Sequence, residues 1–291
     1  CDWSSVVCSS DLMPSLLAGR MIGAFALTES GAGSDAFSAV TSAQARPDGS
    51  FVLQGQKQWI TNGGLADLFI VFATVPVHGL TAFLVDRTSP GVEIGHEERK
   101  MGLHGSSTTA VILNEVVVSA DRILGPIGRG RDIARTALNY ARLKLGAMCV
   151  GDAKNALREA CRYASLRRQF GRAIASFGAV AHKLGEMVVR TYAVESIVWR
   201  TAGRIDLARA DGESRDAFRS AIDASAVEAS MAKVAGSETL EWIAAEAMQV
   251  LGANGYSRDF QAERRYRDAR PNRIFEGTNE INRLFLAASL M

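Results

Sequence analysis

The stretch LNYARLKLGAMCVGDAKNALREACRYASLRRQ, residues 138–169, decides the fold of the second half of the chain. Its apolar side chains recur every three to four residues, with arginine and lysine between them. This apolar series consists of Leu138, Ala141, Leu145, Met148, Ala156, Ala160 and Ala164. Such a period places the apolar side chains on one face of an α-helix. The stretch therefore predicts a long helix that packs against other helices along its length.

Two further long helical patterns follow. They are FGAVAHKLGEMVVRTYAVESIVWRTAGRI (177–205) and DAFRSAIDASAVEASMAKVAGSETLEWIAAEAMQVLG (216–252). The polar segment DLARADGESRD joins them, and a shorter helix is expected at the C-terminus. Alanine, glycine and serine are frequent on the apolar faces, which allows helices to approach closely. The pattern predicts an antiparallel four-helix bundle over residues 128–291.

The preceding part of the chain has the pattern of β-structure. Short apolar or β-branched runs alternate there with turn signals such as Pro47-Asp48-Gly49. The runs are FVLQGQKQWI (51–60), LFIVFATV (68–75), LTAFLVDR (80–87) and AVILNEVVVS (110–119). No helix of about 12 residues separates them, which disfavours a βαβ sheet and favours an antiparallel barrel or sandwich. The predicted fold class is α+β, with a middle β domain at residues 13–127 before the bundle.

The first twelve residues, CDWSSVVCSSDL, match neither pattern. The string CSSDL resembles translated sequencing-adapter DNA. We therefore expect residues 1–12 to be a non-native leader and exclude them from the fold prediction.

Composition narrows the classes of function. The 291 residues are 47% hydrophobic, enough for a buried core, and the net charge of +2 does not favour nucleic acid as a partner. No apolar run reaches the ~18 residues that span a bilayer, and the N-terminus has no secretory pattern. We expect a cytoplasmic location, with peripheral membrane association of a full-length form as an alternative. The histidines and cysteines have no ligand spacing, so no metal site is expected.

The glycine-rich segment FALTESGAGSDAFS (25–38) is a candidate ligand loop. Gly31 and Gly33 permit close approach of a ligand, and Thr28 and Ser34 offer hydroxyls. The segment fits neither GxGxxG nor GxxxxGKS, so neither a nicotinamide cofactor nor ATP is indicated. A plain connection between strands explains the same glycines without a ligand.

Three further motifs have a functional and a purely structural interpretation. In QKQWITNGG (56–64), Trp59 and Thr61 lie on one face of a strand and suit a flat heterocycle, although a core tryptophan is the simpler reading. The arginines of RRQFG (167–171) could bind phosphate, or could only favour the helix macrodipole. The segment QVLGANGY (249–256) could be no more than a helix C-cap.

The segment RIFEGTNEINR (273–283) places a carboxylate beside apolar residues. Glu276 follows Ile274 and Phe275, which suits a desolvated general base whose pKa is raised by burial. The structural alternative is a turn that opens a terminal helix, with Thr278 as the N-cap and Glu280 in the first turn.

In their order and approximate spacing, these five motifs resemble the acyl-CoA dehydrogenase family, which uses FAD. The resemblance spans residues 13–291, and the C-terminal half is most similar to the very-long-chain branch. It implies a middle β domain followed by a four-helix bundle. It also implies that an N-terminal helical domain is missing upstream, so this chain would be a fragment that is inactive alone. Relatives often have glycine where Ala253 stands.

The resemblance implies an enzyme of fatty acid β-oxidation that introduces an α,β double bond into a fatty acyl-CoA thioester. Glu276 would abstract the α-proton, and FAD would accept the β-hydride. Some relatives carry the base on the first bundle helix, at the position of Ala141, which cannot accept a proton. The implied partners are acyl-CoA, an electron-transfer flavoprotein as electron acceptor, and further copies in a homodimer or homotetramer. The alternatives are an acyl-CoA oxidase-like flavoenzyme and a non-catalytic assembly protein on the same fold.

The resemblance also implies individual site residues. The expected FAD contacts are Phe25, Leu27, Thr28, Gly33, Ser34, Trp59, Ile60, Thr61, Arg167, Phe170, Gln249, Gly252, Thr278 and Glu280. Among them Arg167, Phe170 and Gln249 would reach the FAD of an adjacent subunit. The expected substrate contacts are Ser34, Asn139, Arg142 and Gly277.

Overall fold

The computed structural model describes residues 11–210 and 215–291, and the chain divides into two compact units. The β unit comprises residues 11–100 and 104–135 of the described chain, and the helical unit comprises residues 101–103 and the described residues from 136 onward. Most of the predicted leader, residues 1–10, lies outside the described residues. Leu12, at the end of that leader, is buried with Leu68 and Leu84.

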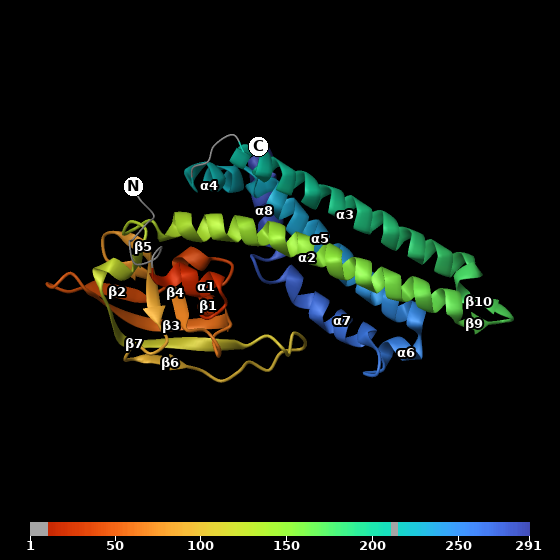
Figure 1. Ribbon diagram of the computed structural model, residues 1–291, viewed down its shortest axis with the longest axis horizontal. Helices are drawn as coiled ribbons and strands as arrows, with labels where there is room; N and C mark the ends of the chain where they lie inside the picture. Colours follow the sequence, from red (N-terminus) through yellow and green to blue (C-terminus); the bar gives the residue numbers. More distant parts are fainter. Residues whose placement is uncertain (1–10, 211–214) are drawn as a thin grey trace. The chain divides into compact units, whose positions relative to one another are not determined.

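The β unit is built on an eight-stranded sheet in the order β6-β7-β3-β2-β4-β5-β8, with β1 paired to β4 (Figure 1). The strands are β1 (Gly23–Ala26), β2 (Ser42–Ala45), β3 (Phe51–Thr61), β4 (Leu68–Val75), β5 (Gly79–Asp86), β6 (Val92–Ile94), β7 (Thr108–Val118) and β8 (Ile123–Leu124). A short helix, α1 (Met13–Leu17), and two 3-10 turns, η2 (Ala36–Ser38) and η3 (Ala120–Arg122), complete the unit.

The four strands predicted from apolar runs are confirmed as β3, β4, β5 and β7. The β3–β7 and β4–β5 pairs are antiparallel, as expected. The prediction of a wholly antiparallel sheet was wrong at two pairs, because β1 and β2 each pair with β4 in parallel. Parallel neighbours need a long crossover, and the chain between β2 and β4 supplies one by passing through β3. The inward side chains of β3, β4, β5 and β7 form one core, with Phe69, Val71, Phe83 and Leu113 fully or almost fully buried.

The helical unit follows. Its helices are α2 (Gly130–Leu166), α3 (Gly178–Ala210), α4 (Arg215–Ala224), α5 (Ala226–Leu251), α6 (Ala253–Tyr256), α7 (Gln261–Ala269) and α8 (Asn279–Leu290). The short elements are β9 (Arg168–Gln169), β10 (Arg172–Ala173), η4 (Ile174–Ser176) and η5 (Arg270–Arg273). The α+β class, a β-sheet domain followed by a helical domain, is confirmed. The predicted helix at 216–252 is two helices, because the chain leaves the helical ladder at Ser225 between α4 and α5.

The central helix of this unit is α5, which packs against α3, α7 and α8 (Figure 1). It also lies very close to α2. A Cβ atom added at Gly146 of α2 would meet the Ala232 carbonyl oxygen at 2.9 Å, and one at Gly236 of α5 would lie 3.2 Å from the Cα of Gly146. Small residues thus let α2 and α5 approach, as the composition of their apolar faces predicted. Arg142 lies about one helical turn before Gly146, and Lys233 lies about one helical turn before Gly236. The close approach of the two helices therefore brings Arg142 and Lys233 near each other.

Within residues 11–210 and 215–291, no helix combines the length and apolar character needed to cross a membrane. The same residues contain no group of three or more His, Cys, Asp and Glu side chains that could hold a metal ion. Cys149 and Cys161 are free thiols, and burial raises the pKa of Cys149 to about 12.

Candidate active site

Glu276 lies in a tight turn between η5 and α8. Glu276 and Gly277 have φ values of 58° and 76°, so both are in the left-handed region. That conformation is uncommon for a residue other than glycine and is concentrated at functional sites. Thr278 ends the turn as the N-cap of α8, where its Oγ1 accepts a hydrogen bond from the Ile281 amide at 3.3 Å. Thr278 is therefore the N-cap, as the structural interpretation of this segment predicts. The functional interpretation concerns Glu276, two residues earlier in the same turn.

The carboxylate of Glu276 is unusual among buried polar groups. Its Oε2 atom is buried and has no hydrogen-bond partner. Burial raises the pKa of Glu276, while the positive charges of Arg142 and Lys233 act in the opposite direction. Ile274 and Phe275 are themselves 55% and 39% exposed, so neither of these apolar neighbours lies in the core. A buried oxygen without a donor is free to accept a proton from a ligand.

Arg142 of α2 contacts the turn directly. Its Nε donates to the Glu276 carbonyl oxygen at 3.2 Å, and its Nη1 donates to Asn139 Oδ1 at 3.3 Å. Asn139 is buried, and its Nδ2 donates to Asp223 Oδ1 at 3.1 Å. The structure thus brings three predicted substrate residues, Asn139, Arg142 and Gly277, together with Glu276. Asn139 is held by Asp223 and Arg142 within this cluster.

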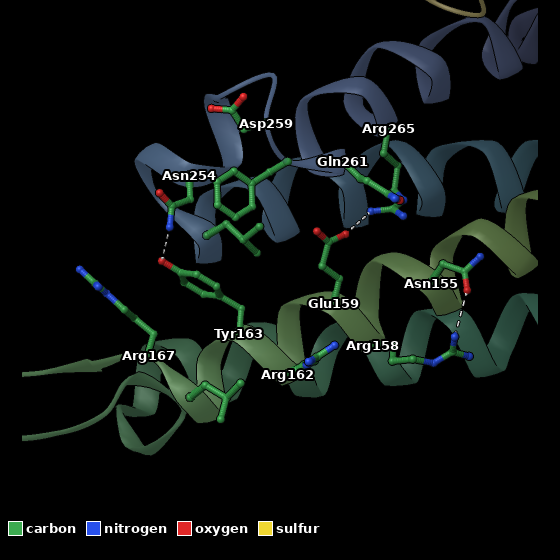
Figure 2. A pocket seen from close by; sticks show the side chains of 13 residues that line it. Asn155, Arg158, Glu159, Arg162, Tyr163, Arg167, Asn254, Asp259, Gln261 and Arg265 are labelled. Atoms are coloured by element: carbon green, nitrogen blue, oxygen red, sulfur yellow. Dashed lines mark hydrogen bonds and ion pairs between the residues drawn. The ribbon is translucent and has the colours of Figure 1, made fainter. Parts of the chain in front are cut away.

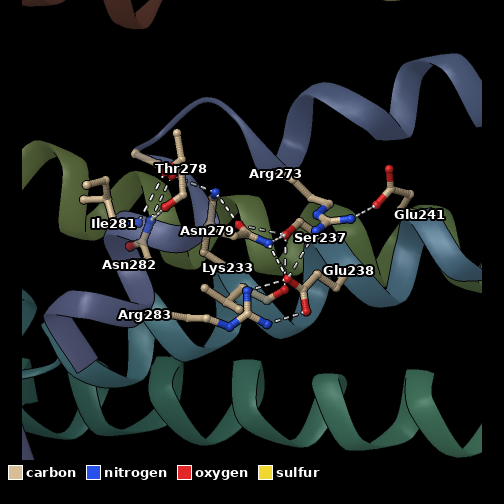
Figure 3. A network of polar contacts seen from close by, with 12 residues as sticks. Lys233, Ser237, Glu238, Glu241, Arg273, Thr278, Asn279, Ile281, Asn282 and Arg283 are labelled. Carbon is tan, nitrogen blue, oxygen red and sulfur yellow. Dashed lines mark hydrogen bonds and ion pairs between the residues drawn. The ribbon is translucent and has the colours of Figure 1, made fainter. Parts of the chain in front are cut away.

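Three residues that the sequence did not single out complete the turn. Asn282 donates from Nδ2 to the carbonyls of Glu276, Gly277 and Thr278, at 3.4, 2.8 and 3.0 Å. Lys233 of α5 and Asn279 at the start of α8 form the contact network of Figure 3. The available signal was the position of Lys233 on the apolar face of the pattern ASMAKVAGS, where a lysine is out of place.

The β unit carries the other group of predicted residues. The β3–β7 register shifts between Lys57 and Ile60, which marks a β-bulge, and Trp59 within it has a φ of 61° and is 57% exposed. A bulge re-aims a side chain out of the regular pleat. The amide of Gln58 in the same bulge donates to the Thr28 carbonyl at 2.9 Å, so the bulge adjoins the glycine-rich loop.

This surface suits a flat heterocycle. It joins an exposed indole at Trp59 to the exposed residues Thr61, Gly33 and Ser34, and a Cβ added at Gly33 would meet nothing within 4 Å. The loop is held from beneath by Glu29, whose carboxylate accepts from the amides of Val40 and Thr41 and from Lys57. The observed arrangement, an open aromatic face with hydroxyls beside it, fits a flavin ring.

Three predicted cofactor residues are less open. Leu27 and Ile60 are 4% and 2% exposed, which leaves mainly their backbone groups for a ligand. Phe25 is partly buried, and its ring centroid lies 4.9 Å from that of Phe72.

The remaining predicted residues lie at two ends of the helical unit. Thr278 ends the Glu276 turn, and Glu280 lies in the first turn of α8. Gln249 and Gly252 lie at the end of α5, about 24 Å and about 28 Å from Lys233 by the rise of an α-helix. Phe170, 93% exposed, lies in the β9–β10 hairpin and packs its ring edge on Phe177. Gln249, Gly252 and Phe170 therefore lie too far from the Glu276 turn for both sets of residues to surround one flavin ring in a single copy of the chain.

A groove of about 760 Å³ opens at this second end of the helical unit (Figure 2). Its lining residues come from the C-terminal half of α2 and from the segment after α5, and they include Arg167, Arg162, Tyr163 and Asn254. Asn254 Nδ2 donates to the Tyr163 hydroxyl at 3.1 Å and ties the two segments together. Arg167 points from the end of α2 beside this groove, where an anion could reach it.

Comparison with known proteins identifies the family of both units. Residues 24–116 match the family described as acyl-CoA dehydrogenase, middle domain, and residues 128–291 match acyl-CoA dehydrogenase, C-terminal domain. A probable acyl-CoA dehydrogenase of Bacillus subtilis (strain 168) is 43% identical over 285 residues, covering 96% of this chain and 48% of that protein. The mitochondrial very long-chain specific acyl-CoA dehydrogenase of Macaca fascicularis is 38% identical over 285 residues, covering 94% and 42%.

Among solved structures, the acyl-CoA dehydrogenase of Bacillus anthracis, crystallised as a complex with FAD, superposes with a TM-score of 0.93 at 42% identity. The match covers 96% of this chain and 49% of that one, so the chain spans about half the length of such relatives. Two family domains matched in order, together with this identity, establish the relationship. The chain belongs to the acyl-CoA dehydrogenase family, and it carries that family's middle and C-terminal domains.

Proposed function

We propose that the protein carrying this chain is an FAD-dependent acyl-CoA dehydrogenase of fatty acid β-oxidation, which introduces an α,β double bond into a fatty acyl-CoA thioester. The observation that supports this most strongly is the buried Oε2 of Glu276, which has no hydrogen-bond partner and belongs to a carboxyl group whose pKa burial raises. An α-proton of a thioester is weakly acidic, so its removal needs a base in a site of low polarity. Glu276 has this environment.

In the proposed reaction, Glu276 accepts the α-proton of the thioester at Oε2. The electron pair released at the α-carbon then forms the double bond as the β-carbon loses its hydrogen as a hydride, whose two electrons bound FAD would accept. Arg142 holds the backbone at Glu276 through the 3.2 Å bond to its carbonyl, and so keeps the carboxylate in place. Ala141, the neighbouring residue on α2, offers no competing base.

The β unit would bind the cofactor. Trp59 and Thr61 would lie along the flavin ring, and Thr28, Gly33 and Ser34 would form the loop beside it. When bound, FAD supplies a two-electron acceptor. Arg167, Phe170 and Gln249 would contact the FAD of an adjacent copy in a homodimer or homotetramer, which agrees with their distance from Glu276 within one copy.

The variant Glu276→Gln tests the assignment. It keeps nearly the same shape, so FAD should remain bound at the wild-type stoichiometry, but it cannot accept the proton. We expect flavin bleaching by a saturated acyl-CoA, measured by stopped-flow, to slow by at least ~10²-fold, the usual contribution of a positioned general base. A suitable control is Glu246→Gln on α5, a partly buried glutamate paired with Lys183, which should bleach at the wild-type rate.

If the Glu276→Gln variant bleaches as fast as the wild type, the base lies elsewhere and the assignment fails.

The reoxidation step tests the second half of the proposal. Electrons should pass to an electron-transfer flavoprotein, with slow reaction toward dioxygen. Fast reoxidation by dioxygen would instead identify an acyl-CoA oxidase.

A further inference from the structure

Lys233 is fully buried on α5, at 0% exposure. Its Nζ donates to the Gly277 carbonyl at 2.7 Å and to Asn279 Oδ1 at 2.6 Å. Both acceptors are neutral, so the ammonium group is bound by the turn that carries Glu276 and not by a carboxylate. Figure 3 shows Lys233 beside Asn279, which links it further to Ser237 and Glu238. Lysine is almost never fully buried without a paired charge, so this placement needs an explanation.

The turn that Lys233 holds is strained and has few anchors. A non-glycine residue with positive φ persists only where its surroundings determine it. The carbonyls of Glu276 and Gly277 accept from Arg142, Asn282 and Lys233. Asn282 is part of α8, which directly follows the turn. Within the described residues, two side chains therefore tie these carbonyls to helices that precede the turn in the chain. They are Arg142 on α2 and Lys233 on α5.

We propose that Lys233 is a positioning residue for Glu276. By binding the Gly277 carbonyl and the Asn279 side chain, it fixes the left-handed turn and holds the Glu276 carboxylate in its buried place. The inference rests on the proposed function, in which Glu276 is the base, and extends it to a residue on another helix that does not touch the reacting atoms.

Electrostatics support the same role. Burial, and after it the charge of Arg142, lower the pKa of Lys233 to about 8, although Cys149, Glu276 and Glu280 act in the opposite direction. The positive charge of Lys233 in turn lowers the pKa of Glu276 against the effect of burial. Removing that charge should therefore make Glu276 harder to ionise.

The test compares Lys233→Met with Lys233→Arg in the flavin-loaded protein. We expect Lys233→Met to slow flavin bleaching at neutral pH by at least about tenfold, because small displacements of a reacting group are costly. The KM for acyl-CoA should change little. The rise of the bleaching rate with pH should move to higher pH, and Lys233→Arg should restore that profile at least in part because it keeps the charge.

A control separates positioning from loss of stability. Ile243→Ala creates a cavity on the same helix, away from the turn, where Ile243 is fully buried. It should lower the midpoint of thermal unfolding but leave the pH profile in place. If Ile243→Ala shifts the profile as Lys233→Met does, the positioning role is wrong.

A second readout does not depend on turnover. Amide hydrogen exchange over residues 274–282 should accelerate in Lys233→Met and remain slow in Ile243→Ala. Unchanged exchange and an unchanged pH profile in Lys233→Met would overturn the proposal. If Lys233→Met does not fold, Lys233→Gln, which keeps an N–H donor without the charge, decides between the same outcomes. Wild-type bleaching in Glu276→Gln would instead refute the role of Glu276 as the base, and the exchange measurement would still test the contact between Lys233 and the turn.

Discussion

Among residues 11–210 and 215–291, two lysines, one in each unit, are fully buried, and their partners differ. Lys57 on β3 forms an ion pair with Glu29, with 2.7 Å between Nζ and Oε1. Lys233 on α5 is bound by neutral oxygens of the Glu276 turn. One buried lysine thus meets a buried carboxylate directly, and the other holds the backbone beside one.

The two carboxylates differ accordingly. Burial alone would raise the pKa of Glu29, but hydrogen bonds from Lys57, Thr41 and the Val40 amide outweigh it and lower that pKa. Burial also raises the pKa of Glu276, and there the nearby charges do not reverse it. The Glu29 carboxylate accepts hydrogen bonds at both oxygens, and these bonds tie the loop to β3. A carboxylate with an unpartnered oxygen is available for proton transfer.

The largest expected effect on stability comes from breaking the buried ion pair between Lys57 and Glu29. Lys57→Met should destabilise the protein by about 3–5 kcal/mol, because it leaves Glu29 buried without its counter-charge. Urea unfolding measures the change. Lys154→Met is the matched control, since its pair with Glu195 is partly exposed and should contribute less than about 1 kcal/mol. If Lys57→Met and Lys154→Met lose the same free energy of unfolding, the buried pair contributes no more to stability than the partly exposed pair.

Glu276→Gln should change the free energy of unfolding in the opposite direction, toward greater stability. The folded pKa of Glu276 lies above its unfolded value of 4.5, so the folded state binds the extra proton and loses stability as pH rises through that window. The amide does not titrate. At neutral pH the variant should therefore be more stable than the wild type, by up to about 2 kcal/mol, a gain typical of a relieved functional site.

The pH dependence separates the two carboxylates. The gain of Glu276→Gln should vanish below pH 4.5 and be complete above the raised pKa. Glu29, with a lowered pKa, contributes stability above 4.5 that is lost as pH falls through its folded pKa. Urea unfolding of Glu276→Gln and Glu29→Gln at several pH values measures both. A gain from Glu29→Gln at neutral pH would contradict the comparison.

Much of the fold could be predicted because apolar periodicity is local. The run 68–75 coincides with β4, and the apolar series from 138 to 164 falls within α2. The parallel pairing of β1 with β4 could not be predicted, because periodicity shows which face of a strand is buried and not its neighbour. The break at Ser225 was missed because the sequence has no glycine or proline there.

The candidate site was predictable in part for a similar reason. Glu276 belongs to a short motif, and Trp59 to another. Lys233 was missed because its acceptor, Gly277, lies 44 residues later in the chain. The apolar neighbours of Lys233 mark it as out of place, but they do not show what it binds until the packing of α5 against the turn is known. Contacts between distant segments decide the role of such a residue, and local patterns do not contain them.

The smallest expected effect concerns the glycine after the base. Gly277→Ala places a side chain at a φ of 76°, which should cost about 1 kcal/mol. Gly49→Ala has the same kind of backbone strain, at a φ of 84°, with nothing within 4 Å of the new Cβ, so its loss of stability should be similar. At Gly277 the new Cβ would lie 3.2 Å from Asn282 Nδ2 and 3.4 Å from Arg142 Nη2, atoms of two side chains that hold the turn. Gly277→Ala should therefore also slow flavin bleaching, whereas Gly49→Ala should not. Equal unfolding free energies combined with equal bleaching rates would show that the turn tolerates displacement, and that the buried position of Glu276 does not depend on this set of donors.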